Sequence, residues 1–368
     1  MRSFLYATVI VALVASIAAQ NIKPVGELFQ VDFTTNNQGG CNYVGQANMQ
    51  QILQDAYDLG TIGSQLVSDY KNNVAEARRL LDSFFQVQNP PMNENELEDI
   101  SGAYKQVSDW ILNGGPYDNE SRDNTPFLFC FHNWLQKKTM NDPAQDENGE
   151  TYPNVESGGA PFLIRDNEVY RNMQQKETED ANLKTPASPY WSYKHHAYIF
   201  DRSYGGPNTG MCSRGNYAGS AQHVLNPSTI TLCPFFFGTT NARSGGINYV
   251  ARRSVAPNPI LRANINTAPA NAQTLSDVTP TATTLFHELF HLVSGNELTT
   301  PPPPGEVYGL LEGEPENPNK IVGLDFDNAS ENPESFALAA IAYDYTLNWP
   351  PDNAGNRIEF EAGYTTQG

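Results

Sequence analysis

The spacing of apolar residues over the first third of the chain predicts a group of helices. Between residues 42 and 88, apolar side chains recur at the three- and four-residue intervals that place them on one helical face. Gly60 and Gly63 interrupt this pattern, so we expect two helices there. A third helix is expected at about 94–112, before Gly114-Gly115-Pro116. Its apolar stripe consists of Leu97, Ile100, Tyr104, Val107, Trp110 and Ile111.

Beyond residue 126, short apolar runs lie between turn residues, a pattern typical of buried strands. These runs are Phe127–Phe131, Tyr193–Phe200 and Ile230–Phe237. His195 and His196 lie in the second run. Adjacent residues of a strand face opposite sides, so at most one of the two could reach a metal, and we expect both to be structural. The polar segment 141–190 is expected to be an insertion with a hairpin rather than a separate domain.

Helices followed by short strands predict an α+β fold. We expect one domain over 41–350, whose first part, 41–115, is helical. Residues 20–40 are predicted to be a polar leader in loop conformation, and 351–368 a tail. The chain has 368 residues, of which 39% are hydrophobic and 11% aromatic. This is enough apolar material for a sizeable core.

Residues 1–19 have the features of a secretory signal peptide. Arg2 supplies the charged start, Phe4 to Val14 form the apolar run, and Ala15 to Ala19 offer small residues for cleavage. The run is too short for a comfortable membrane span, and no later segment is long and apolar enough. We therefore expect a secreted, extracellular protein. An anchoring helix is the alternative.

Cysteines and glycosylation motifs fit that expectation. The four cysteines are Cys41, Cys130, Cys212 and Cys233. An even number in an oxidising compartment suggests two disulfides with three possible pairings, of which Cys41–Cys130 with Cys212–Cys233 is the simplest by order. None of the spacings is the close pair of a structural zinc site. Asn119 and Asn328 each begin a glycosylation motif, so a glycoprotein is expected.

The charge of the chain is strongly acidic. With 22 Lys and Arg against 41 Asp and Glu, the net charge is −19. Such a charge argues against nucleic acid and anionic membrane surfaces as partners. One interpretation of this acidic charge is a surface that keeps the protein soluble. A more specific interpretation is that an acidic cleft attracts basic peptides.

The stretch 279–292 carries the candidate chemistry. It contains His287-Glu288-Leu289-Phe290-His291, a His-Glu-x-x-His motif. Residues four apart lie on one face of a helix, so the two imidazoles can bind one Zn²⁺. Glu288 can then act as general base towards a water at the metal. The alternative is an amphipathic helix that carries two histidines and no metal.

The residues around this motif favour a helix. Thr279 can cap it, and Pro280 fits the first helical position. The leucines of the motif region recur at helical spacing and are expected to face the core. Gly295 then ends the helix. The core-facing leucines are Leu285, Leu289 and Leu292.

A catalytic zinc typically has three protein ligands and one open position, so a third ligand is needed. The acidic candidates are Glu297, Glu306 and Glu334. Glu334 lies in the first turn of a helix that Asn332 and Pro333 are expected to begin, where a favourable interaction with the helix dipole would also explain it. Spacing alone does not choose among the three.

Several segments together resemble the deuterolysin and peptidyl-lysine metalloendopeptidase family of secreted zinc proteases, the aspzincins. The similar segments keep the family's order over most of 41–347, although the zinc motif alone is specific by itself. They are Cys41 to Phe85, Ile230 to Phe236, Leu285 to Leu292, Tyr308-Gly309 and Asn328 to Ala340. The resemblance implies a zincin-like α+β metallopeptidase domain with one Zn²⁺ per chain.

The likeness departs from the family at the third ligand. The family has an aspartate in Gly-Thr-x-Asp-x-x-Tyr-Gly, and the position three before Tyr308 is Gly305 in this chain. Glu306, one residue further on, is the ligand we favour, with Glu334 and Glu297 as alternatives. Tyr308 would then lie near the zinc and could stabilise the oxyanion. The alternative for Tyr308 is a buried aromatic residue in a turn.

We therefore expect a secreted zinc metalloendopeptidase that acts as a monomer on protein or peptide substrates. Its strand near Thr229–Leu232 would pair with the substrate backbone. The alternative function is a secreted zinc-binding protein of the same fold without proteolytic activity. A structural or adhesive glycoprotein that has lost the metal is a third possibility.

Overall fold

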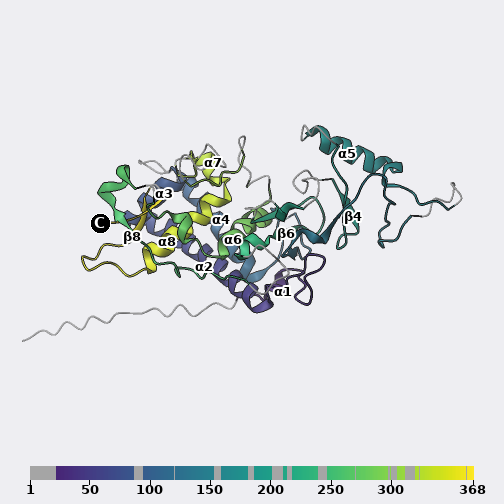
Figure 1. Cartoon of the computed structure of the whole chain (residues 1–368). Helices are drawn as coiled ribbons and strands as arrows, with labels where there is room; N and C mark the ends of the chain where they lie inside the picture. Colours follow the sequence, from purple (N-terminus) through teal and green to yellow (C-terminus); the bar gives the residue numbers. More distant parts are fainter. Residues whose placement is uncertain are drawn as a thin grey trace, which may run out of the picture.

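The computed structural model describes residues 22–86, 94–119, 121–152, 159–180, 186–200, 210–213, 218–238, 247–269, 271–296, 299, 305–310, 320–322, 324–361 and 363–368. The fold is mixed α+β, as expected. Its helices gather at one side, and a lobe containing α5 and β4 projects from the other (Figure 1). The predicted signal peptide 1–19 lies outside these residues. None of the described helices is both long and apolar enough to cross a membrane.

The described part of the chain combines helices of up to 26 residues with strands of two to four residues. The α-helices are α1 (Val25–Leu28), α2 (Gln46–Lys71), α3 (Ala75–Phe85), α4 (Glu94–Asn113), α5 (Glu168–Asp180), α6 (Ala282–Ser294), α7 (Phe326–Ser330) and α8 (Pro333–Asn348). The strands are β1 (Phe127–Phe129), β2 (Leu135–Lys137), β3 (Tyr190–Ser192), β4 (Ala197–Ile199), β5 (Gly219–Gln222), β6 (Thr229–Leu232), β7 (Ile260–Leu261), β8 (Ile358–Glu361) and β9 (Tyr364–Gln367). Short 3₁₀ turns connect several of them.

The first two predicted helices divide at a different place from the one expected. Gly60 and Gly63 do not interrupt the helix, because α2 continues through both and ends at Lys71. These glycines mark a close helix contact. A Cβ atom at Gly63 would lie 2.2 Å from the ring of Tyr104 in α4, and one at Gly60 would lie 2.2 Å from Ser108 Oγ. The apolar stripe predicted for α4 is buried as expected.

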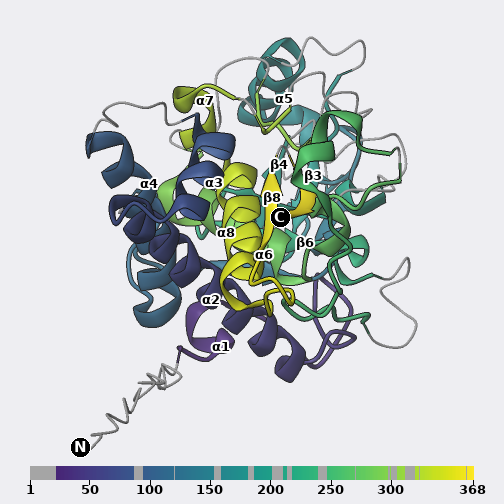
Figure 2. The same ribbon diagram turned by 90° about the vertical axis from the view of Figure 1, so that its left-hand side faces the viewer.

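Helix α6 lies at the centre of the helical part. It packs against α2, α4 and α8 on one side and against β5 and β6 on the other. Every residue from Leu285 to Ser294 is therefore buried, including the three predicted core leucines. Figure 2 shows α8 beside α3 and α2, the helices that cover it.

The sheet beside α6 has the order β1-β6-β5. β6 is parallel to β1 and antiparallel to β5, so it is paired along both edges. The expectation that Thr229–Leu232 pairs with a substrate is therefore wrong, because its backbone hydrogen bonds are already used. Among the described strands, β5 has one neighbour, β6, and on its other edge Ala221 N–H is bound by Glu288 of α6.

The projecting lobe contains the sheet β2-β3-β4 and helix α5. The predicted strand Tyr193–Phe200 is wrong in its first half, because residues 193–196 form the turn between β3 and β4. His195 has a structural role there: its Nδ1 lies 2.8 Å from Ser192 Oγ and its Nε2 lies 2.9 Å from Pro227 O. The small core of the lobe contains Ala144, Ile164, Trp191, Tyr198 and Phe200.

The two flanking segments belong to the folded body, contrary to their description as leader and tail. In 20–40, α1 and Phe29 are buried in the main core, and Gln30 forms a bridge with Phe127 in parallel orientation. In 351–368, β8 and β9 form a hairpin that pairs with β7. Phe360 of β8 packs against Tyr345 of α8, and short-range sequence patterns do not reveal such contacts.

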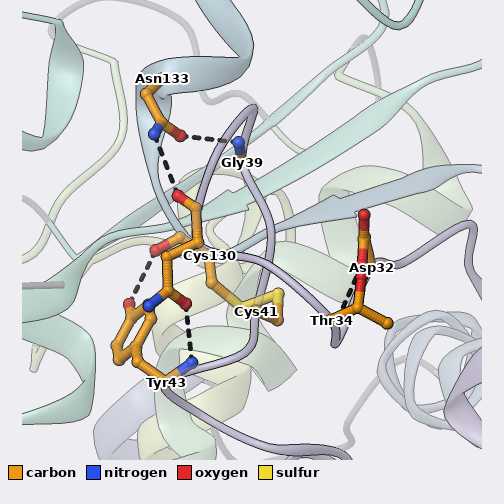
Figure 3. The surroundings of a disulfide bond; sticks show 8 residues. Asp32, Thr34, Gly39, Cys41, Tyr43, Cys130 and Asn133 are labelled. Carbon is orange, nitrogen blue, oxygen red and sulfur yellow. Dashed lines mark hydrogen bonds between the residues drawn. A yellow bond between two sulfur atoms is a disulfide. The ribbon is translucent and has the colours of Figure 1, made fainter. Parts of the chain in front are cut away.

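Both expected disulfides are present. Cys41 bonds to Cys130, and Cys212 bonds to Cys233, which is consistent with an oxidising compartment. The first joins the segment before α2 to the end of β1. The Tyr43 hydroxyl donates to the Cys130 carbonyl beside it (Figure 3). Asn133 extends this contact by accepting a hydrogen bond from Gly39 N–H at 2.6 Å.

Candidate metal centre

Helix α6 presents the motif residues as expected but begins later than predicted. Its first residue is Ala282, and Thr279 and Pro280 precede it. The N-cap residue is Thr281, whose hydroxyl oxygen accepts from Val250 N–H at 2.8 Å and is thus engaged by a neighbouring segment. Gly295 ends the helix with a φ of 81°, as its sequence position predicted.

The three motif side chains are buried together. The exposed fractions of His287, Glu288 and His291 are 3%, 5% and 8%. One nitrogen or oxygen of each lies within 4.8 Å of the others, close enough to hold a metal ion. Burial of two imidazoles and a carboxylate in an apolar core costs free energy unless these groups have polar partners. Their grouping therefore favours a metal site over a purely structural role in the core.

Glu306 closes the same space from a different segment. Its Oε1 atom lies 2.7 Å from His287 Nε2 and 3.2 Å from His291 Nε2. The Tyr308 hydroxyl donates to Glu306 Oε2 at 2.5 Å, and its ring stacks on His287 with 5.7 Å between centroids. Tyr308 is 54% exposed, so it is not the buried aromatic residue of the alternative. The structure thus brings both residues to the histidine pair.

The second nitrogen of each imidazole is held by a hydrogen-bond acceptor. His287 Nδ1 donates to Glu334 Oε2 at 2.8 Å. The Thr299 hydroxyl donates to Gly295 O, so its oxygen accepts from His291 Nδ1, also at 2.8 Å. With hydrogen on both Nδ1 atoms, the Nε2 atom of each ring faces the space beside Glu306, where its lone pair could bind a metal once the proton it shares with Glu306 is lost.

This arrangement separates the three acidic candidates. Glu306 lies on the Nε2 side, where a metal would bind. Glu334 lies on the opposite side of His287, where it orients the ring. Glu297 lies outside the described residues.

The carboxylate of Glu288 contacts the sheet beside α6. Its Oε2 accepts from Ala221 N–H of β5 at 2.6 Å. Burial raises the pKa of Glu288 above the ordinary value, while the charges of His287 and His291 act in the opposite direction. A fixed carboxylate with a raised pKa suits proton transfer.

His287 and Glu306 form a strongly coupled pair. Burial favours their neutral forms, but each stabilises the charge of the other by proximity and hydrogen bonding. The result is a raised pKa for His287 and a lowered pKa for Glu306. The negative charge of Glu306, which stabilises the protonated form of His287, would also attract a metal cation.

Sequence reasoning did not assign two further residues that shape this centre. Asn332, which is fully buried, accepts from Val307 N–H at 3.0 Å and donates to Val307 O at 3.1 Å. It thereby holds the chain between Glu306 and Tyr308. His223 Nε2 donates to the His291 carbonyl at 3.0 Å, which fixes the last turn of α6. Asn332 was expected to be a helix cap, and no local signal indicated its partner 25 residues away.

The donor set fits zinc. Two imidazole nitrogens and one carboxylate oxygen meet in one place, and the outer nitrogens are held by a carboxylate and a hydroxyl, as in zinc centres generally. The chain matches no family model, no curated protein and no solved structure. The interpretation of this centre therefore depends on its own geometry.

Proposed function

We propose that this protein is a secreted zinc metalloendopeptidase with a zincin-like domain, similar to the aspzincins. The observation that carries the proposal is the convergence of His287 Nε2, His291 Nε2 and Glu306 Oε1 beside the buried carboxylate of Glu288. The two disulfides are consistent with the oxidising compartment that secretion requires.

In this proposal His287, His291 and Glu306 hold one Zn²⁺. When bound, zinc supplies Lewis acidity, which polarises a peptide carbonyl and makes water a better nucleophile. Glu334 and Thr299 keep the imidazoles in the orientation that binding needs. Asn332 keeps Glu306 in place through the backbone of Val307.

Glu288 is the general base. Its carboxylate takes a proton from the attacking water and delivers it to the leaving amine. The hydrogen bond from Ala221 N–H fixes the position of this carboxylate. The Tyr308 hydroxyl, exposed and close to the same place, is the donor for the oxyanion once it leaves Glu306.

The outer edge of β5, opposite β6, is the surface for an extended substrate, which would pair with the groups of this edge other than the Ala221 N–H held by Glu288. An unpaired edge can add one more strand through main-chain hydrogen bonds. β5 is suitably placed, because Ala221 in this strand contacts Glu288 and Gly219 lies beside the same side chain. This role replaces the one expected of β6.

A Glu288→Gln variant tests the mechanism. We expect the purified variant to retain about one zinc per chain and to cleave an unstructured protein at least ~100-fold more slowly, because a general base typically contributes ~10²–10⁴ in rate. Zinc content is measured by metal analysis and cleavage by the appearance of new amino termini. A Glu27→Gln variant, which changes an exposed glutamate of α1, serves as the matched control.

Other outcomes separate the remaining possibilities. Normal cleavage by Glu288→Gln would exclude this mechanism. Stoichiometric zinc without cleavage by the unmodified protein would favour the zinc-binding alternative. No zinc uptake after dialysis against a zinc buffer would exclude both.

A further inference from the structure

A cavity of about 310 Å³ adjoins the candidate metal centre. Glu334 lies in its wall and also contacts His287 Nδ1. Thr284, also in the wall, lies one helical turn before Glu288 on the same face of α6. A Cβ atom at Gly219 would lie 3.0 Å from Thr284 Cγ2 and 3.1 Å from Glu288 Oε1. The start of β5 thus borders both the cavity and the general base.

Apolar side chains form much of the cavity surface. The larger ones come from four separate parts of the chain: the turn after β6, the segment 247–250, the residues just before α6, and α8. Phe235, which lines the cavity, is 53% exposed and can therefore be reached by a ligand. The apolar residues in the wall include Phe235, Phe236, Val250, Pro280 and Leu338.

Three of the polar side chains in the wall, those of Thr279, Thr281 and Thr283, are engaged with their own neighbours, and Asn248, Ser276 and Thr284 complete the uncharged polar lining. The hydroxyls of Thr279 and Thr283 donate to the carbonyls of Ser276 and Pro280. The hydroxyl oxygen of Thr281 accepts from Val250 N–H. These threonines therefore offer their methyl groups more readily than their hydroxyl groups to a ligand.

Charge in the cavity is limited as well. Among the described residues that line it, Glu334 alone is charged, and its carboxylate already accepts from His287. A basic side chain would have to share this one carboxylate with the His287 ring, and an acidic side chain would be repelled by it. Burial of a charge without a dedicated partner is unfavourable.

We propose that this cavity is the specificity pocket of the protein and accepts a bulky uncharged side chain next to the cleaved peptide bond. The inference rests on the proposed peptidase function and deepens it. The volume is about twice the roughly 150 Å³ that is enough to hold benzene, so leucine, methionine and phenylalanine side chains fit. The acidic net charge of the whole chain does not decide this preference, because among the described residues that line the pocket only Glu334 is charged.

The test is a digest of a random peptide library by the full mature protein loaded with zinc, followed by mass spectrometry. We expect one position next to the cleaved bond to be enriched at least ~5-fold in Leu, Met or Phe, and depleted in Lys, Arg, Asp and Glu. A second readout does not need turnover: the same library is passed over immobilised Glu288→Gln protein. The retained peptides should show the same enrichment.

Two variants connect the preference to this cavity. Thr283→Asp adds a carboxylate to the wall and should shift the preferred residue to Lys or Arg, whereas the uncharged Thr283→Asn should not. Aspartate is tolerated in the first turn of a helix, so the fold should persist. Phe235→Ala should weaken the preference, and Val169→Ala, at another exposed apolar residue in α5, should leave it unchanged.

The outcomes are distinct. A preference of the unmodified protein for Lys or Arg, or a preference that Thr283→Asp and Phe235→Ala leave unaltered, overturns the pocket assignment while the peptidase proposal stands. Absence of cleavage and of selective retention overturns the peptidase proposal and the pocket assignment with it.

Discussion

The two imidazoles of the candidate centre are each positioned by a different outer partner, and Glu306 is the residue of the described segments that contacts both Nε2 atoms. Glu306 and Glu334 therefore have distinct roles, although their positions in the sequence did not distinguish between them. In the proposed centre Glu306 is a ligand, and Glu334 holds one ligand in its orientation.

We predict that Glu306→Ala weakens zinc binding more than Glu334→Gln does. Loss of an outer partner typically costs ~10–100-fold in metal affinity, and loss of a ligand should cost more. Competition with a chromogenic chelator measures both. If Glu334→Gln proved the more damaging change, Glu334 would be the ligand and Glu306 the outer residue.

At the same scale, His132 links stability to pH. Burial lowers its pKa from 6.5 to about 4. As the pH falls, His132 is therefore protonated at a higher pH in the unfolded chain than in the folded protein. The resulting stability is complete above pH ~6.5 and is lost as the pH falls towards ~4, by at most about 3 kcal/mol.

The measurement is the free energy of unfolding of the unmodified protein and of His132→Gln at pH 7.5 and pH 4. The variant should lose less stability over this interval, because it has no group to protonate there. Equal losses in the two proteins would show that His132 does not contribute.

At the scale of elements, close packing of α2 on α4 explains why a helix tolerates two glycines in its interior. Tyr104 fills the space that a side chain at Gly63 would need, and its hydroxyl donates to Phe336 O at 2.8 Å in α8. The glycines thus allow three helices to meet around one buried phenol. Their intrinsic cost to helix stability is offset by this contact.

A pair of glycine substitutions tests this explanation. Gly63→Ala should destabilise the protein by about 1–3 kcal/mol, because the new methyl group overlaps the Tyr104 ring. Gly102→Ala in α4 meets no atom within 4 Å and should stabilise it by about 0.5–1 kcal/mol. Denaturant unfolding compares the two. A stabilising Gly63→Ala would contradict the packing argument.

The first turn of α8 is the element that assembles the candidate centre. Asn332 precedes it and holds Val307, while Glu334 within it holds His287. Both contacts join segments far apart in the chain. Proline at the start of the helix predicted where α8 begins, but helix signals say nothing about which distant backbone its cap residue will bind.

At the scale of the whole molecule, the two disulfides close loops of very different length. Cys41–Cys130 spans 89 residues and Cys212–Cys233 spans 21. In the chain-entropy description, the longer loop restricts the unfolded chain more. The N-terminal segment and the sheet beside α6 are thus joined covalently as well as by packing.

Removal of each disulfide should therefore have unequal effects. We expect the double change Cys41→Ser and Cys130→Ser to cost about 4–5 kcal/mol, and the double change Cys212→Ser and Cys233→Ser about 3 kcal/mol. Guanidinium unfolding under non-reducing conditions measures the difference. The reverse order would mean that native contacts, rather than loop length, decide these contributions.

Local features determined much of this protein without reference to its tertiary structure. The apolar stripe of α4, strand β1 and the start of α8 depend on residues close together in the chain, and so does the spacing of His287 and His291. Periodicity and spacing report such features directly, because a helix or strand imposes its own repeat. The two disulfide pairs also followed the order of the cysteines.

Tertiary structure decided what depends on distant segments. It placed Glu306 at the Nε2 atoms and Glu334 at Nδ1, gave the outer sheet edge to β5 instead of β6, and buried α1 and the last two strands in the folded body. Glu306 and Glu334, for example, have equivalent local sequence signals, and the terminal segments carry no local signal of the contacts that bury them. Packing decides these outcomes, because close contacts and hydrogen bonds exist only once the segments have come together.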